Sequence, residues 1–347
     1  MLAANNVSRL QVLFHVALPS VADGVPAFLH AVNGPTGLKD LLFVTTKAGH
    51  ILALDAHTGA TVWSHQSPAG SCRINNLLFS CYTTSSPAID PNRRYVYSYG
   101  LDGLVHKYGV GDGAESTGGG WPELVTLKPY DEKGSSPLSV ATARDGQSYL
   151  YVTTSGYLGD QGDYQGHLVA INLADGSQHV FNTLCSDQTV HLVDSRSGSG
   201  ADCKQLQSGV WARTGAVYDP DTDKVYLATG NALFDPAQHD WGDTVLALHP
   251  DGTGAQADPV DSYTPASFAQ LQLLDGDLGS TAPAVLPTLA GSAIQHLAIQ
   301  GGKDATLRLI NLDNLRRDRR ITFLFSANGC AAGSYSSSAA RRGPVAS

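Results

Sequence analysis

The sequence has few charged residues, a single methionine and no long apolar run, and each shortage excludes something. Only 15% of its 347 residues are charged, and runs of helix-forming Glu, Lys or Ala are scarce, so an all-helical fold is disfavoured. No apolar stretch approaches the roughly 18 residues that span a bilayer. The formal charge of −9 argues against a surface for nucleic acid or anionic membrane, which needs a basic patch.

Glycine and proline, by contrast, are plentiful. The chain has 37 Gly and 17 Pro, which is typical of many short strands joined by turns. Hydrophobic residues make up 42% of the sequence, enough to build a sizeable core. We therefore expect a folded, water-soluble, all-β chain without global disorder.

The five cysteines form two local pairs and one remainder. Cys72 and Cys81 flank one short loop, Cys185 and Cys203 flank another, and Cys330 is left over. This spacing predicts two loop-closing disulfides. None of the cysteines forms a CxxC pair, so a structural zinc site is not expected.

Disulfides indicate an oxidising compartment, although the N-terminus lacks the features of a secretory signal. The segment MLAANNVSRLQVLFHV has no basic start, no apolar centre and no cleavage site. We expect a periplasmic or extracellular protein whose signal is missing from this sequence or has been removed.

An internal repeat organises the chain. Residues 41–66 read as three short apolar strands, LLFVTT, HILALD and TVWSHQ, which hairpin-type connections separate, and an upstream strand containing Pro26 adds a fourth. The set returns four more times, with successive offsets of 54, 63, 77 and 62 residues between equivalent positions. These equivalent positions are Ala53, Lys107, Ala170, Ala247 and Leu309.

The first repeat contains ALDAHTGATVW, which resembles the A-x-D-x-x-T-G-x-x-x-W signature of pyrroloquinoline-quinone-type (PQQ-like) propellers of the quinoprotein alcohol dehydrogenase-like superfamily. The matching residues are Ala53, Asp55, Thr58, Gly59 and Trp63. The resemblance implies a β-propeller of four-stranded antiparallel blades, in which this motif locks neighbouring blades together. A large indole in that place buries much area and can donate its N–H to a backbone carbonyl.

Blade number and the two ends stay open. Dehydrogenases of this family have about eight blades by resemblance, whereas five repeats are visible, so the ring is small, incomplete or has six to eight blades. We assign residues 1–315 to the propeller and 316–347 to a poorly ordered tail with one strand. The segment RLQVLFHVAL, residues 9–18, is expected to supply the outer strand of the last blade and close the ring.

Two polar loops between strands are candidate sites. The first is Gly-rich and holds Asp160 and Asp163, whose carboxylates could give oxygen ligands to calcium. The second holds four more candidates, which are Asn231, Asp235, Trp241 and Asp243. In PQQ dehydrogenases, carboxylate and amide side chains hold calcium beside the quinone and an Asp accepts the alcohol proton, so the resemblance makes these residues cofactor-site candidates.

Arg213 is a further candidate, because it stands where other repeats carry SSP, at the innermost strand, and would point toward the channel or the neighbouring blade. One departure weakens the catalytic interpretation: well-known PQQ alcohol dehydrogenases carry a disulfide between adjacent cysteines, and this chain has no Cys-Cys pair.

Three functions therefore compete, and the sequence does not decide whether the chain is an enzyme. The first, which we prefer at this stage, is an exported non-catalytic propeller that binds a small molecule, a glycan or a protein at one face. The second is a PQQ- and calcium-dependent alcohol or sugar dehydrogenase. The third is a glycan-binding or glycan-processing propeller that uses Trp241 and neighbouring acids. A monomer is expected under all three.

Overall fold

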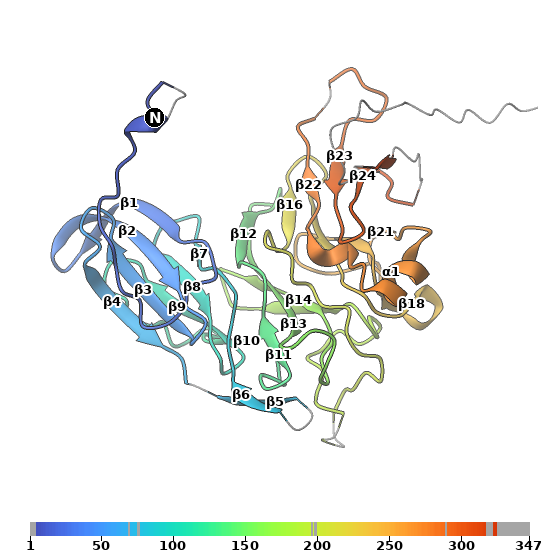
Figure 1. The fold of residues 1–347 in the computed structure, drawn as a ribbon, viewed down its shortest axis with the longest axis horizontal. Helices are drawn as coiled ribbons and strands as arrows, with labels where there is room; N and C mark the ends of the chain where they lie inside the picture. The colour runs from blue at the N-terminus through green and yellow to red at the C-terminus, as the bar shows by residue number, and fades with distance from the viewer. Residues whose placement is uncertain are drawn as a thin grey trace, which may run out of the picture.

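A computed structural model describes residues 5–316 and 322–324, apart from positions 69, 75, 76, 196, 198, 199 and 289. Five blades, each with four antiparallel strands, follow one another along the described part of the chain, and the sheet of the third blade has a fifth strand. Figure 1 shows them side by side, from blue for the first blade to orange-red for the fifth. The fold is an all-β propeller built from the repeats that the sequence predicted. No helix among the described residues is long and apolar enough to cross a membrane.

The blades have the following strands, in chain order. Blade one is β1 (Ala27–Gly34), β2 (Gly37–Thr45), β3 (His50–Asp55) and β4 (Thr61–Gln66). Blade two is β7 (Ala88–Ile89), β8 (Tyr95–Tyr99), β9 (Leu104–Gly109) and β10 (Glu123–Leu124). Blade three is β12 (Ser139–Thr142), β13 (Ser148–Gly156), β14 (His167–Asn172) and β15 (Gln178–Asn182), with β11 (Glu132–Gly134) paired to the end of β13.

Blade four is β16 (Val217–Asp219), β17 (Lys224–Ala228), β20 (Val245–Leu248) and β21 (Asp261–Tyr263), and blade five is β22 (Ala284–Val285), β23 (Leu297–Gln300), β24 (Thr306–Asn311) and β25 (Thr322–Leu324). Two hairpins stand outside the blades, β5–β6 (Ser71–Ile74, Leu77–Ser80) and β18–β19 (Phe234–Asp235, Asp240–Trp241). The helices are α1 (Phe268–Leu274) and three 3-10 turns, η1 (Val7–Arg9), η2 (Pro236–Gln238) and η3 (Leu278–Ser280).

Strand alternation gives each blade two apolar faces, and successive blades pack through them. Four hydrophobic clusters join blade one to two, two to three, three to four and four to five. The positions equivalent by repeat all lie on third strands, where Ala53 pairs with Phe43, Ala170 with Tyr151 and Ala247 with Tyr226. The small alanine therefore sits beside a large aromatic ring on the second strand.

The expectation that residues 9–18 close the ring is wrong. Val16 and Leu18 form no strand and pack instead on the free face of blade one, against Val44, Leu52 and Leu54. The outer strand of blade five is β25, which pairs with β24. No hydrophobic cluster in the described part of the chain joins blade five to blade one.

The last strand also bears on the C-terminal region. β25 lies beyond residue 315, so blade five takes its fourth strand from the segment that the sequence assigned to the tail. Residues 325–347, including Cys330, lie outside the described residues.

Candidate functional site

One end of the propeller gathers the polar residues. Because strands within a blade are antiparallel, the entry to the first strand and the connection between the second and third strands lie at the same end. We call this end the loop face. The second-to-third connections of blades three, four and five carry Asp160, Asn231 and Lys303, and the segment entering blade five carries Asp277.

Asn231 contacts the carboxylates of Asp160 and Asp277, and these three residues form what we call the acidic end of the loop face. The backbone N–H of Asn231 donates to Asp277 Oδ1 at 2.7 Å, and its side-chain Nδ2 donates to Asp160 Oδ2 at 3.0 Å. The hydroxyl of Tyr164 donates to the other oxygen of Asp160 at 3.4 Å. Asn231 and Asp277 are buried. Two carboxylates and an amide from three blades thus converge on one place.

Lys303 lies against the acidic end. Its ammonium Nζ is 2.5 Å from Asp277 Oδ2 and 2.9 Å from Asp275 Oδ1, and it stands 5.4 Å from the centre of the Trp211 ring. Lys303 therefore bridges the carboxylates of Asp275 and Asp277, and its ammonium also lies over the Trp211 ring, where a cation is attracted to the aromatic face.

A second buried acid stands behind this group. Asp243 Oδ1 accepts from the backbone N–H of Leu278 at 2.9 Å, while its Oδ2 is buried with no hydrogen-bond partner. Burial, with a smaller effect from Asp277, raises the pKa of Asp243 to about 6. Burial also raises the pKa of Asp277, against the opposing hydrogen bond from Lys303. Ionising these buried carboxylates therefore costs free energy. A bound cation would offset that cost.

A cavity of about 550 Å³ opens beside Lys303, between α1 and blade five. Its volume falls in the range of small-molecule sites. Leu271 and Leu274 on α1 line one part of it, and Asp275 and Lys303 line another. The Asp275 side chain is 62% exposed, so it reaches the cavity while Asp277 stays buried.

A second group of residues on the loop face is cationic, and we call it the basic end. Arg213, which enters blade four, donates to Asp23 Oδ1 at 3.0 Å and to the Asp23 carbonyl at 3.2 Å. Asp23 enters blade one, and Lys47 Nζ lies 3.9 Å from its other carboxylate oxygen. Lys47 also stands 4.8 Å from the Tyr82 ring.

Lys133 is the buried member of the basic end. Its Nζ donates to Ser135 Oγ at 2.7 Å, and that hydroxyl is 2.9 Å from Ser155 Oγ. Burial, reinforced by the like charges of Lys47 and Arg213, lowers the pKa of Lys133 to about 7. Three cations with one carboxylate between them make a region that would accept an anion.

The other sequence candidates fall elsewhere. Asp163 accepts from Ser195 N at 2.8 Å and Oγ at 2.5 Å, away from the contacts of the acidic end. Asp235 caps the η2 turn through a bond from Ala237 N. Trp241 is only 2% exposed, so it presents no ring face to a ligand.

The most informative site residues were not singled out from the sequence. Asp275, Asp277 and Lys303 come from DGD and GGKD, two short segments that look like ordinary turns. The available signal was position: DGD lies in the segment that enters blade five, and GGKD joins its second and third strands, so both had to lie on the loop face.

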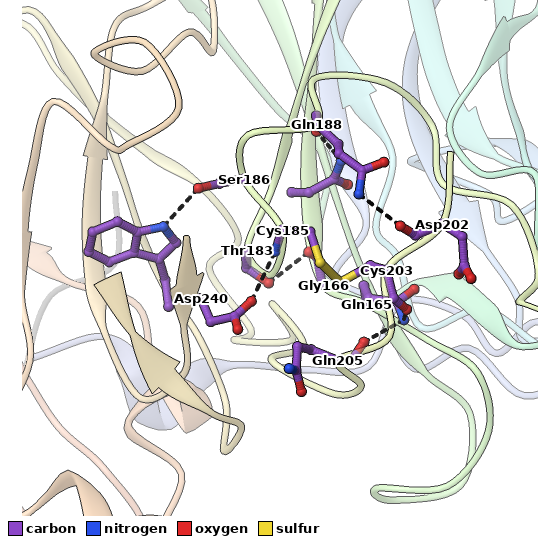
Figure 2. Close-up of a disulfide and its surroundings, with 12 residues drawn as sticks. Gln165, Gly166, Thr183, Cys185, Ser186, Gln188, Asp202, Cys203, Gln205 and Asp240 are labelled. Atoms are coloured by element: carbon purple, nitrogen blue, oxygen red, sulfur yellow. Dashed lines mark hydrogen bonds between the residues drawn. A yellow bond between two sulfur atoms is a disulfide. The ribbon is translucent and has the colours of Figure 1, made fainter. Parts of the chain in front are cut away.

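Both predicted disulfides are present, and one supports the acidic end. Cys72 pairs with Cys81 across the β5–β6 hairpin, and Cys185 pairs with Cys203. The carbonyl of Cys203 accepts from Gln165 Nε2 at 3.2 Å, next to Tyr164 in the chain. Figure 2 shows this disulfide among the polar side chains that surround it.

Several solved structures have a fold similar to that of this chain. No protein-family model matches the chain, and no curated protein matches it either. A europium-containing methanol dehydrogenase is 19% identical, with a TM-score of 0.55 over 88% of this chain and 52% of its own. A quinohaemoprotein alcohol dehydrogenase from Comamonas testosteroni is 14% identical, with a TM-score of 0.53 over 88% of this chain and 43% of its own.

A similar enzyme from Pseudomonas putida HK5 is 15% identical, with a TM-score of 0.51 over 85% of this chain and 44% of its own. The chain thus spans about half the length of these structures. These similarities show a shared fold, the β-propeller of four-stranded antiparallel blades that the repeats predicted.

Proposed function

We propose that the chain binds a PQQ-type quinone together with a hard cation, calcium or a lanthanide, at the loop face and oxidises an alcohol. The observation that carries this proposal is the convergence of Asp160, Asn231 and Asp277 beside Lys303 and Trp211. The fold similarity to a europium-containing methanol dehydrogenase supports it. The two disulfides support a periplasmic or extracellular location.

The residues present fit both groups. Carboxylate and amide oxygens are the ligands that hard cations take, and the orphaned Oδ2 of buried Asp243 adds negative potential close by. The indole of Trp211 offers a flat apolar surface to an aromatic ring system. The carboxylates of a PQQ-type molecule would be drawn to the cations of the basic end, Lys47, Lys133 and Arg213.

The chain's own residues then have separate roles. Asp160, Asn231 and Asp277 would hold the cation, and the quinone, when bound, supplies a two-electron acceptor. Asp275 faces the cavity and is held by Lys303 at 2.9 Å, so we assign it acceptance of the hydroxyl proton of the substrate. The ammonium of Lys303 orients the Asp275 carboxylate.

A non-catalytic binding propeller is the second candidate, because the chain lacks the adjacent cysteine pair of the well-known enzymes. The same site would then bind its ligand without turnover. The glycan-binding alternative is not supported, because it relies on the Trp241 ring and that ring is buried.

Reconstitution separates these functions. Purified protein is titrated with PQQ and Ca²⁺ or Eu³⁺ while cofactor absorbance and dye-linked oxidation of an alcohol panel are followed. We expect binding and turnover in the parent, binding without turnover in Asp275→Asn, and neither in Asp277→Ala. Asp145→Asn, in the β12–β13 turn at the opposite end of blade three, is the matched control and should behave as the parent. Binding without turnover in the parent would favour the non-catalytic module, and no binding at all would reject the proposal.

A further inference from the structure

A second group of ligand-type side chains lies apart from the acidic end. The sulfur atoms of Cys185 and Cys203 and a carboxylate oxygen of Asp240 all lie within 4.8 Å of one another. Asp240 begins β19, and its register partner across the small hairpin is Asp235. Figure 2 shows the Asp240 carboxylate beside the disulfide, bonded to the backbone of Cys185.

The carboxylate of Asp240 is incompletely satisfied. Asp240 is only 1% exposed, and its Oδ1 accepts a hydrogen bond from the Cys185 backbone N–H at 3.0 Å. Its Oδ2 is buried and has no hydrogen-bond partner. A buried, unpartnered carboxylate oxygen is unfavourable and rare in native structures. Burial raises the pKa of Asp240, against the opposing hydrogen bond from the Cys185 backbone.

We propose that Cys185, Cys203 and Asp240 form a zinc-type metal site when the disulfide is reduced. The disulfide takes two electrons and two protons from two thiols of a reductant, which become a disulfide themselves. A divalent ion then binds the two cysteine sulfurs and displaces their two protons, while Asp240 contributes an oxygen. Two thiolates with one carboxylate suit a tetrahedral thiophilic ion, with water as the fourth ligand.

Such an ion would preserve the cross-link. The Cys203 carbonyl holds Gln165, and Thr183, two residues before Cys185, donates to the Gly166 carbonyl at 2.7 Å. Either the disulfide or the metal would therefore keep these segments joined beneath the loop that carries Asp160. The cross-link between these two segments would then persist in both an oxidising and a reducing medium. The metal site does not depend on the proposed quinone site.

The test uses the full chain with the competing thiols removed, Cys72→Ser, Cys81→Ser and Cys330→Ser together. After phosphine reduction and removal of metals, Co²⁺ is titrated and its absorption is followed. We expect one equivalent of Co²⁺ with a thiolate-to-cobalt charge-transfer band and tetrahedral visible bands, and displacement by Zn²⁺. Adding Asp240→Asn should weaken binding about tenfold or more, since it removes a charged ligand.

Two matched controls make the result specific. Asp235→Asn, on the facing strand of the same hairpin, should bind Co²⁺ as the parent does. Cys185→Ser with Cys203→Ser should lose the charge-transfer band. The proposal is overturned if the band never forms, if Asp240→Asn binds as tightly as the parent, or if reduction abolishes the β-sheet circular dichroism and Zn²⁺ does not restore it.

Discussion

The indole Nε1 of Trp63 donates a hydrogen bond of 3.0 Å to the carbonyl of Val110, across the boundary between blade one and blade two. The ring is 8% exposed and lies 5.7 Å, centre to centre, from Phe43. It also lies against Gly113, where φ is +70° and an added Cβ would stand 2.7 Å from an indole carbon. Both the backbone conformation and the close approach therefore require glycine at this turn of blade two.

Replacing Trp63 should weaken the contact between these two blades. Trp63→Ala removes the buried ring and leaves a cavity, and we expect the free energy of unfolding to fall by about 3–5 kcal/mol. Trp63→Phe keeps most of the apolar contact but leaves the Val110 carbonyl unpaired, so a smaller loss of about 1–2 kcal/mol is expected. Urea unfolding followed by far-UV circular dichroism measures both. A Trp63→Phe variant as stable as the parent would contradict a role for the hydrogen bond, and equal losses in the two variants would contradict a role for the buried ring.

The repeat was predictable because its signals are local. Alternation over five or six residues and a turn sequence such as AHTGA are written within one blade, so the strands and the role of Trp63 follow from the sequence. The closure of the ring was not predictable in this way. Residues 9–18 have a strand-like pattern, but the free apolar face of blade one competes for Val16 and Leu18, and only the folded chain reveals that face.

The site was predictable in part for the same reason. Asp160 and Asn231 stand in conspicuous polar insertions, and both reach the acidic end. Asp277 and Lys303 stand in short turns without unusual composition, and their importance comes from contacts between residues that are distant in sequence. Trp241 shows the opposite error, since an aromatic ring among acids suggested a ligand face and instead fills the core.

Asp243 should make stability fall as pH rises through the mildly acidic range. Its pKa in the folded chain is about 6, above the usual 3.8, so between these values the folded state keeps a proton that the unfolded state releases. The free energy of unfolding then decreases as pH rises across this window. Asp243→Asn keeps an acceptor for Leu278 N and cannot ionise, so it should be more stable than the parent by about 1–3 kcal/mol at neutral pH.

The difference in the free energy of unfolding between Asp243→Asn and the parent should shrink toward zero near pH 4, where the parent carboxyl becomes protonated in the unfolded state as well as in the folded state. Urea unfolding at several pH values, without added divalent ions, provides the comparison. If the free energies of unfolding of the parent and of Asp243→Asn differ by the same amount from acidic to neutral pH, Asp243 does not hold a proton in the folded state.

The acidic end should bind a lanthanide without any quinone. Tb³⁺ is a suitable probe because its luminescence is sensitised by a nearby indole, and Lys303 links Trp211 to Asp277 through contacts of 5.4 and 2.5 Å. We expect saturable luminescence under indole excitation. Asp277→Asn should weaken binding at least about tenfold, because it removes a charged oxygen ligand.

Trp211→Phe separates sensitisation from affinity. This variant should lose most of the luminescence while it still binds Tb³⁺, as competition with Ca²⁺ or calorimetry would reveal. Unchanged luminescence in Trp211→Phe would place the ion elsewhere in the molecule.

The basic end should bind a tricarboxylate in a pH-dependent way, because Lys133 has a pKa of about 7. Below that pH its ammonium is charged, buried and close to Lys47 and Arg213, which costs stability that a bound anion restores. Benzene-1,3,5-tricarboxylate should therefore raise the melting temperature more at pH 6 than at pH 9, where Lys133 is neutral. Lys133→Met should remove the pH dependence of this shift, whereas Lys224→Met, in β17 of blade four, should retain it. An equal shift at both pH values in the parent would mean that Lys133 does not face the anion.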